Sequence, residues 1–178
     1  MNEPRGVRQS SETKFRGRIF EVTSDLVTLP NGRTVTMEIV RHPGSVVLLP
    51  MPDPSRVVLV RQYRYALDRW IWELPAGSLD AGEDPVAAAA RECEEEISLV
   101  PGRVEYLGAW FPTPGFVTEA MNYYKLTGLR APDPSGPQAK QDEDEDIRVT
   151  VFTLEEARDL VRRGEIIDLK TAWGLTLV

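Results

Sequence analysis

Residues 77–99, GSLDAGEDPVAAAARECEEEISL, constrain the fold more than any other part of the chain. At 100° per residue, the apolar side chains between residues 86 and 97 fall on one stripe, which predicts a helix packed against a core. Asp84 is a good N-cap and Pro85 suits the first helical position, so we expect the helix to run from Pro85 to about Ile97. The rest of the chain must supply an apolar surface to cover that stripe.

The same helix carries an unusual concentration of negative charge. Glu92, Glu95 and Glu96 lie at i, i+3 and i+4, so their side chains meet on a face beside the apolar stripe. Carboxylates this close repel one another, and the helix macrodipole disfavours them further near the C-terminal end. A hard divalent cation, Mg²⁺ or Mn²⁺, would turn the repulsion into a binding site, and a solvated acidic face is the alternative.

Short apolar segments elsewhere predict the strands that this helix packs on. They are rich in β-branched and aromatic residues and separated by turn signals: SVVLLP (45–50), RVVLVRQYRYA (56–66), RVEYLGAWF (103–111), MNYYKLTGL (121–129) and IRVTVFTL (147–154). A second helix is predicted from the capping-box pattern that begins at Thr153 to about Arg163, with Gly164 ending it. Mixed strands and two helices predict a sheet sandwiched between helices.

The N-terminal part predicts a separate small sheet. Residues 14–40 contain three strand-like segments, RGRIFEV, DLVTL and RTVTMEIV, and an Asn31-Gly32 hairpin signal joins the last two. Residues before this region lack the apolar segment of a secretory signal and resemble a frayed start. The His42-Pro43-Gly44 sequence interrupts the strand pattern. We therefore expect an N-terminal antiparallel sheet over residues 1–42 and a larger domain over residues 43–178.

Composition narrows the class of protein. The 178 residues suit one domain of ordinary size with a small appendage, and no apolar run approaches the roughly 20 residues that cross a membrane. The net charge of −7 argues against a protein that tracks nucleic-acid backbones. The lone cysteine, Cys93, cannot form an internal disulfide. We expect a soluble cytoplasmic protein without a nucleic-acid or membrane partner, and a mobile acidic loop over residues 131–146.

The stretch over residues 77–99 resembles the Nudix box, G-x5-E-x7-R-E-U-x-E-E-x-G-U with U aliphatic. The positions in register are Gly77, Glu83, Arg91, Glu92, Glu95, Glu96 and Leu99. Cys93 replaces an aliphatic residue, which is a mild change, and Ser98 replaces a glycine where φ > 0 is often required, at a cost of about 1 kcal/mol. The resemblance implies a Nudix-type α/β/α sandwich with a mixed sheet, in addition to the small N-terminal antiparallel β-sheet.

The resemblance also implies roles for the residues of the box. Glu92, Glu95 and Glu96 would bind the catalytic Mg²⁺ or Mn²⁺ ions, and the backbone carbonyl of Ala76 would add a ligand. The supporting residues would be Gly77, Glu83 and Arg91. In this interpretation Arg91 is an internal ion-pair partner that orients the glutamates.

The sequences flanking the box resemble the ADP-ribose pyrophosphatase branch of the family. They are VRQYRYALDRWIWELPAG (60–77) and TPGFVTE (113–119), with Pro114 fifteen positions past Leu99. This resemblance implies metal-dependent hydrolysis of ADP-ribose to AMP and ribose 5-phosphate. GDP-mannose, other nucleotide sugars and dinucleoside polyphosphates remain alternative substrates. A non-catalytic sensor of ADP-ribose is a further alternative, which the complete set of box glutamates argues against.

Further candidates surround the predicted site. Arg61 and Arg64 are predicted to contact phosphate or ribose, because a planar guanidinium suits paired oxygens. The turn residues Pro114, Gly115 and Phe116 are predicted to bind substrate. Either Glu119 or Glu95 would be the general base. Adenine needs a flat apolar partner, for which the candidates are Phe20, Tyr63, Trp70 and Trp110. The resemblance finally implies a homodimer in which the N-terminal sheet exchanges between subunits.

Overall fold

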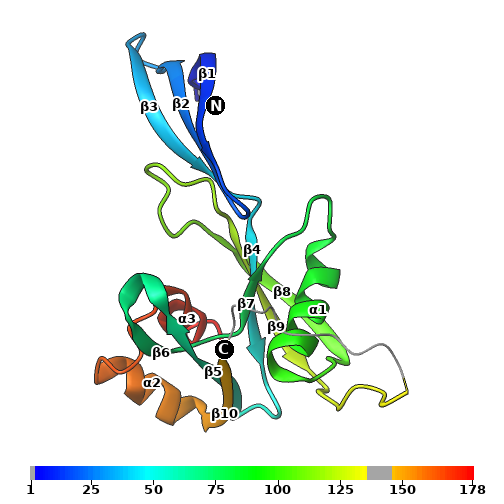
Figure 1. Ribbon diagram of the computed structural model, residues 1–178. Helices are drawn as coiled ribbons and strands as arrows, with labels where there is room; N and C mark the ends of the chain where they lie inside the picture. Colours follow the sequence, from blue (N-terminus) through cyan, green and yellow to red (C-terminus); the bar gives the residue numbers. More distant parts are fainter. Residues whose placement is uncertain (1–2, 136–145) are drawn as a thin grey trace. The chain divides into compact units, whose positions relative to one another are not determined.

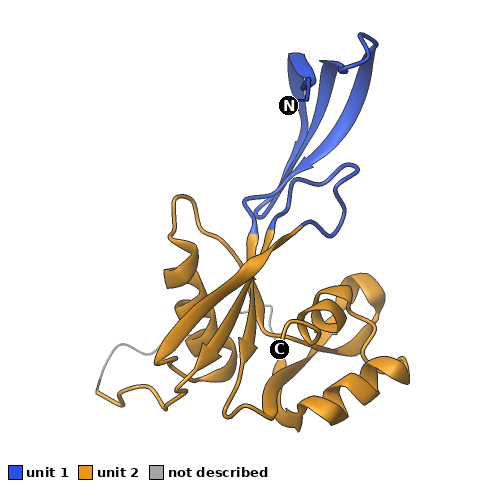
Figure 2. Ribbon diagram, turned by 180° about the vertical axis from the view of Figure 1, so that it is seen from behind, with its two compact units in different colours: residues 1–44, 111–120 blue, residues 45–110, 121–178 orange. Residues whose placement is uncertain are grey.

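The computed structural model describes residues 3–135 and 146–178, which form two compact units (Figure 1). Unit 1 contains residues 1–44 and 111–120, and unit 2 contains residues 45–110 and 121–178 (Figure 2). The chain therefore divides two residues after the predicted boundary at residue 42, and the segment 111–120 groups with the N-terminal unit. Most of the loop predicted over residues 131–146 lies outside the described residues.

Unit 1 is built on a three-stranded antiparallel sheet in the order β1-β2-β3. Its strands are β1 (Val7–Arg16), β2 (Glu21–Thr28) and β3 (Thr34–Arg41). The hairpin predicted at Asn31-Gly32 is present: Gly32 has a φ of 81°, and the Asn31 side chain accepts a hydrogen bond from the Arg33 amide at 3.0 Å.

The beginning of this sheet differs from the prediction. Residues 17–20, which were predicted to lie in a strand, form a turn closed by the Gly17 amide and the Phe20 carbonyl at 2.9 Å. The expected frayed start is also wrong, because β1 begins at Val7. All ten residues of β1 are exposed, so the strand has no alternating apolar pattern by which its sequence could reveal it. Backbone pairing with β2 holds it in place.

The described residues of unit 2 form two sheets. The four-stranded sheet β7-β4-β9-β8 is mixed, because β4 runs parallel to β9 while the other pairs are antiparallel. Its strands are β4 (Ser45–Pro50), β7 (Ala76–Ser78), β8 (Arg103–Trp110) and β9 (Met121–Thr127). The antiparallel sheet β10-β5-β6 contains β5 (Arg56–Arg64), β6 (Arg69–Glu73) and β10 (Ile147–Thr153), with a short 3₁₀ helix, η1 (Tyr65–Leu67), between β5 and β6.

The helices begin at the predicted caps. In α1 (Pro85–Ile97), the Asp84 side chain accepts from the Val86 amide at 3.1 Å. In α2 (Leu154–Arg162), Thr153 and Glu156 form both halves of the capping box. A third helix, α3 (Leu169–Gly174), is capped by Asp168. None of the helices in the described ranges is long and apolar enough to cross a membrane.

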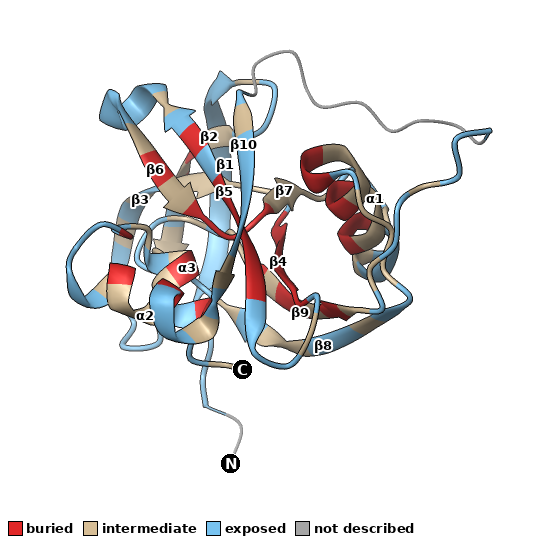
Figure 3. Ribbon diagram, turned by 90° about the horizontal axis from the view of Figure 1, so that it is seen from below, coloured by how far each residue is buried: buried red, intermediate tan, exposed pale blue. Residues whose placement is uncertain are grey.

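The core of unit 2 has two sides, separated by strand β4. All six residues of β4 are buried (Figure 3), and alternate side chains point to opposite faces. Val46 and Leu48 pack with Cys93 of α1, whereas Val47 and Leu49 pack in a second cluster with Leu160 of α2. This is the predicted α/β/α sandwich around a mixed sheet. Cys93 is fully buried, as expected for a small hydrophobe on the core face, and burial raises the pKa of its thiol to about 12.

Candidate active site

The buried glutamates of α1 lie against the segment that leads from β6 into β7. The Ala76 amide donates to Glu96 Oε1 at 3.1 Å, and Glu96 is only 4% exposed. A Cβ atom built on Gly77 would lie 2.0 Å from the carboxyl carbon of Glu92. Only glycine therefore allows the backbone to approach this carboxylate so closely, which is a physical reason for the first residue of the box.

Arg91 connects the loop before α1 to two of the glutamates. Its Nε and Nη2 atoms each donate to Glu83 at 2.9 Å, which makes a bidentate pair. Its Nη1 donates to both Glu92 and Glu95 at 2.7 Å. The hydrogen bonds that Arg91 donates to Glu83 are the largest of the effects that raise the pKa of Arg91, and the same bonds lower the pKa of Glu83.

The three glutamates predicted to bind metal have two different hydrogen-bond donors. Glu92 and Glu95 meet at Arg91 Nη1, while Glu96 bonds to the Ala76 amide. Within residues 3–135 and 146–178, no three Asp, Glu, His or Cys side chains form a ready metal-binding group. The donor chemistry nevertheless fits a hard divalent cation, because these carboxylates extend from one helix, and the absence of a side chain on Gly77 lets the Glu92 carboxylate lie against the backbone.

The two candidate arginines of β5 face opposite ways. They are three residues apart on one strand, so their side chains lie on opposite faces of the sheet. Arg61 pairs with Trp72 in the strand register, and its guanidinium lies 5.7 Å from the centre of that ring. Arg64 instead makes a bidentate ion pair with Glu73, at 2.6 and 2.8 Å. The structure therefore does not bring these two arginines together.

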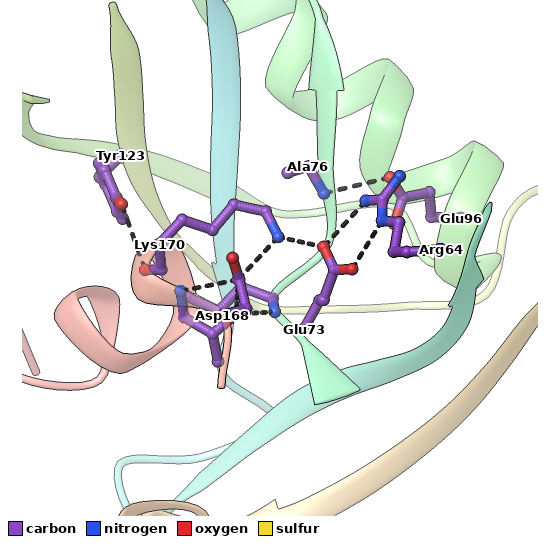
Figure 4. Close-up of polar contacts among 9 residues, drawn as sticks. Arg64, Glu73, Ala76, Glu96, Tyr123, Asp168 and Lys170 are labelled. Carbon is purple, nitrogen blue, oxygen red and sulfur yellow. Dashed lines mark hydrogen bonds and ion pairs between the residues drawn. The ribbon is translucent and has the colours of Figure 1, made fainter. Parts of the chain in front are cut away.

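Glu73 is a central residue that the sequence does not mark. It is 2% exposed and also accepts from Lys170, whose ammonium group bonds to Asp168 at 2.8 Å (Figure 4). Burial alone would raise the pKa of Glu73, but Arg64 and Lys170 outweigh it and lower that pKa. The available signal was a single acidic residue in the apolar run WIWELP, and its partner Lys170 lies 97 positions further along the chain.

The remaining predicted site residues belong to unit 1. Pro114 and Gly115 lie in a turn closed by the Val117 amide and the Thr113 carbonyl at 3.0 Å. Phe116 is 53% exposed and accepts a backbone hydrogen bond from Val40 at 2.8 Å. Glu119 follows in the same segment. The substrate-binding and catalytic roles of these residues stay predictions.

The aromatic candidates for adenine stacking differ in their surroundings. Trp110 packs edge-on against Tyr123 and Trp173, with ring centres 5.1 and 5.3 Å away. The Arg148 guanidinium covers Trp70 at 4.5 Å from the ring centre. The exposed candidates are Phe20, at 41%, and Tyr63, at 38%.

Comparison with known proteins places the chain in a family. The NUDIX domain model matches residues 40–170, which include the mixed sheet and the acidic helix. The chain belongs to the Nudix family, and it is an enzyme of the Nudix pyrophosphohydrolase class.

Its relatives include an ADP-ribose pyrophosphatase of Mycobacterium tuberculosis, 41% identical over 170 residues, which covers 95% of this chain and 81% of the relative. A methanol dehydrogenase activator of Bacillus methanolicus is 39% identical over 161 residues, covering 90% of this chain and 85% of the activator. Among solved structures, an ADP compounds hydrolase has the same fold, with a TM-score of 0.81 at 21% identity and coverage of 99% and 94% of the two chains.

Proposed function

We propose that this protein hydrolyses the diphosphate bond of ADP-ribose, giving AMP and ribose 5-phosphate, in a reaction that needs Mg²⁺ or Mn²⁺. The observation that carries the proposal is the arrangement in which Arg91 gathers Glu83, Glu92 and Glu95 beside the buried Glu96. The resemblance to an ADP-ribose pyrophosphatase over 95% of the chain supports this substrate.

The box residues would hold the metal. Glu92, Glu95 and Glu96, with the Ala76 carbonyl, supply the oxygen ligands that Mg²⁺ prefers. When bound, the metal neutralises charge on the diphosphate and lowers the pKa of a bound water. Arg91 keeps Glu92 and Glu95 close to each other, because both carboxylates accept a hydrogen bond from its Nη1 atom.

The protein's own groups would then move one proton. The oxygen of water attacks a phosphorus atom of the diphosphate, the bridging P–O bond breaks, and a carboxylate accepts the proton that the water loses. Glu119 is the preferred base and Glu95 is the alternative. Of the two arginines, Arg64 is the better substrate contact, because its guanidinium lies on the side of the sheet that carries Glu73, and an electrostatic attraction links it to Glu96.

The proposal includes a substrate-binding turn and a dimer. Pro114, Gly115 and Phe116 would contact the substrate, and the exposed Phe116 ring is free to do so on its own unit's surface. The N-terminal sheet would exchange between the subunits of a homodimer. We also propose a cytoplasmic location, which the buried free thiol of Cys93 supports.

A substrate panel tests the function. We would measure product release from ADP-ribose, GDP-mannose, diadenosine polyphosphates, NADH and 8-oxo-dGTP with Mg²⁺ or with EDTA. Glu96→Gln should abolish cleavage, while Glu94→Gln on the same helix, outside the predicted metal ligands, is the matched control. We expect metal-dependent cleavage with ADP-ribose far ahead of the others. Faster cleavage of GDP-mannose would reassign the substrate, and binding of ADP-ribose without cleavage would favour the sensor.

A further inference from the structure

Helix α3 contacts the chain segment that leads from β6 toward the acidic site. Two adjacent residues of the helix, Lys170 and Thr171, bind two adjacent residues of that segment, Glu73 and Leu74. Lys170 Nζ donates to the Glu73 carboxylate, and the Thr171 hydroxyl accepts from the Leu74 amide at 2.7 Å. Thr171 is fully buried, and the Lys170 side chain is only 13% exposed. Water therefore competes little for either contact, so both fix the end of β6 firmly.

Asp168 organises both contacts. Its Oδ2 accepts from Lys170 Nζ at 2.8 Å, from the Thr171 hydroxyl at 2.6 Å and from the Thr171 amide at 3.0 Å. The Thr171 hydroxyl can thus donate to Asp168 while it accepts from Leu74. The Tyr123 hydroxyl donates to the Lys170 carbonyl at 3.2 Å, which ties the start of α3 to β9 (Figure 4).

The held segment continues directly into the candidate site. The Pro75 carbonyl accepts from the Leu48 amide at 2.8 Å, and the next residue, Ala76, donates its amide to Glu96. Proline has a fixed φ, so this short stretch has little freedom to absorb a displacement. A shift at Glu73 or Leu74 is therefore transmitted to the backbone that bonds Glu96.

Charge provides a second route from α3 to the same glutamate. The Glu73 carboxylate forms an ion pair with Lys170 and a second, bidentate ion pair with Arg64. Figure 4 shows the Arg64 guanidinium bonded to the Glu73 carboxylate, and the charge of Glu96 also attracts this guanidinium. Loss of the Lys170 cation would leave Arg64 as the only cation paired to the buried Glu73 among the contacts described, and would draw the guanidinium away from Glu96.

We infer that Lys170 is a positioning residue for the metal-binding part of the site, and that it acts through Glu73 on Arg64 and on the segment from Leu74 to Ala76. This inference rests on the proposed function, because it assumes that Glu96 is a metal ligand. Lys170 itself would touch neither the metal nor the substrate. Its role is to fix the positions of the Glu96 carboxylate and the Ala76 backbone before the metal binds.

The test compares Lys170→Met with Lys170→Arg, and the readout is metal affinity in the absence of substrate. We would titrate each variant with Mn²⁺ and follow the free ion by electron paramagnetic resonance. We expect Lys170→Met to weaken Mn²⁺ binding about tenfold, at the low end for the loss of a residue that orients metal ligands, and Lys170→Arg to restore most of it. In activity assays, the Mg²⁺ concentration for half-maximal rate should rise by a similar factor, while KM for ADP-ribose at saturating Mg²⁺ changes less than about twofold.

Arg158→Met is the matched control. Arg158 also anchors the C-terminal region, through the carbonyls of Leu175 and Val178, but it does not bond to Glu73. Equal weakening of Mn²⁺ binding in this control would overturn the inference, since general loosening of the C-terminal end would then explain the result. Unchanged Mn²⁺ affinity in Lys170→Met would overturn it as well.

A second variant covers the case in which Lys170→Met does not fold. Asp168→Asn keeps the charge on Lys170 and should weaken Mn²⁺ binding by a smaller factor, and unchanged affinity there would count against the inference. The proposed function fails separately: a wild-type protein that binds Mn²⁺ but cleaves nothing in the panel refutes the activity, while the comparison of affinities still decides the role of Lys170. A wild-type protein that binds no Mn²⁺ would refute both.

Discussion

At the scale of single residues, the uncharged Gly77 constrains the geometry of the site as strongly as the carboxylates do. Gly77 lies where any side chain would meet the Glu92 carboxyl group. Glu92 in turn accepts one of the hydrogen bonds that Arg91 Nη1 donates. The atoms in the way belong to the flexible end of a side chain. An added methyl group can therefore be accommodated if the Glu92 carboxylate moves.

We predict that Gly77→Ala folds but loses most of its activity. The new methyl group would push the Glu92 carboxylate away from Arg91 and from the predicted metal position, with a loss in kcat of about 10²-fold, comparable to loss of a catalytic positioning contact. Steady-state kinetics and circular dichroism check the two parts. Gly6→Ala is the matched control, because its methyl group would meet only ordinary contacts at 3.4 Å. Full activity in Gly77→Ala would contradict the assignment of Glu92 to the site.

The general base is decided by a second pair of variants. If Glu119 accepts the proton from water, Glu119→Gln lowers kcat by about 10²-fold or more and leaves KM nearly unchanged. Glu95→Gln would instead weaken metal binding together with kcat, since Glu95 is also a predicted ligand. Rates at saturating metal separate the two effects. An unchanged kcat in Glu119→Gln would move the role of base to Glu95.

At the scale of elements, strong local sequence patterns predicted correct helix and strand boundaries. Contacts between residues far apart in the sequence could not be predicted in this way. Helix α1 and strand β4 begin and end where their patterns predict, because a capped apolar stripe and a continuous apolar run are local properties. Strand β6 and helix α3 are only five and six residues long, so their patterns were too short to read. For the same reason the box indicated Arg91 and its glutamates, whereas the Glu73–Lys170 pair depends on a fold that brings distant residues together.

The end of α1 allows a direct test of local strain. Ser98 closes the helix with a φ of 55°, in the left-handed region where the sequence pattern of the box has glycine. Its amide bonds to the Glu94 carbonyl at 3.0 Å, and its side chain is exposed. We predict that Ser98→Gly raises the free energy of unfolding by about 1 kcal/mol, because glycine adopts this conformation without steric cost.

Urea denaturation of Ser98→Gly and Ser98→Ala measures this effect. Alanine keeps the Cβ atom, so Ser98→Ala should not stabilise the protein. A gain in both variants would point to the lost hydroxyl instead of backbone strain. A gain in neither would mean that the helix end relaxes around serine.

At the scale of the whole molecule, a buried charge links stability to pH. The pKa of Glu73 is lower in the folded protein than its ordinary value of 4.5, because Arg64 and Lys170 outweigh the effect of burial. The unfolded chain therefore takes up this proton first as the pH falls. The stability that Glu73 contributes is present above pH 4.5 and is lost as the pH decreases through the folded pKa.

We predict that Glu73→Gln lowers the free energy of unfolding at pH 7 by about 3 kcal/mol, at the low end for a broken buried pair because the Arg64 side chain is 41% exposed. The variant should also lose less stability than wild type as the pH falls below 4.5. Urea unfolding at several pH values measures both effects. Glu105→Gln, which removes an exposed pair with Arg103, should change stability by less than about 0.5 kcal/mol. Parallel pH profiles for wild type and Glu73→Gln would contradict this account.

The distribution of charge supports the proposed homodimer. Residues 1–44 contain seven Lys and Arg against five Asp and Glu, whereas the remaining residues contain 14 against 23. The N-terminal sheet is thus weakly basic and the rest of the chain is strongly acidic, so the sheet of one copy is electrostatically suited to the acidic part of another. Strand β1 also leaves apolar side chains exposed, with Val7 at 58% and Phe15 at 53%. A three-stranded sheet with such a surface would gain stability from the proposed partner subunit.

We predict a particle of twice the chain mass of 20.0 kDa in light scattering at low salt. The double variant Arg5→Glu and Arg33→Glu changes two exposed side chains of the N-terminal sheet region and should weaken the dimer. Reversing the charges of Arg162 at the end of α2 and of Arg163, the residue after it, changes the net charge equally and is the matched control. If the basic N-terminal region pairs with acidic residues, only the first variant dissociates at concentrations where wild type does not, and 1 M salt has a similar effect on wild type because screening shortens to about 3 Å. A monomer under all conditions would remove the exchanged sheet from the proposal and leave each chain to complete its own site.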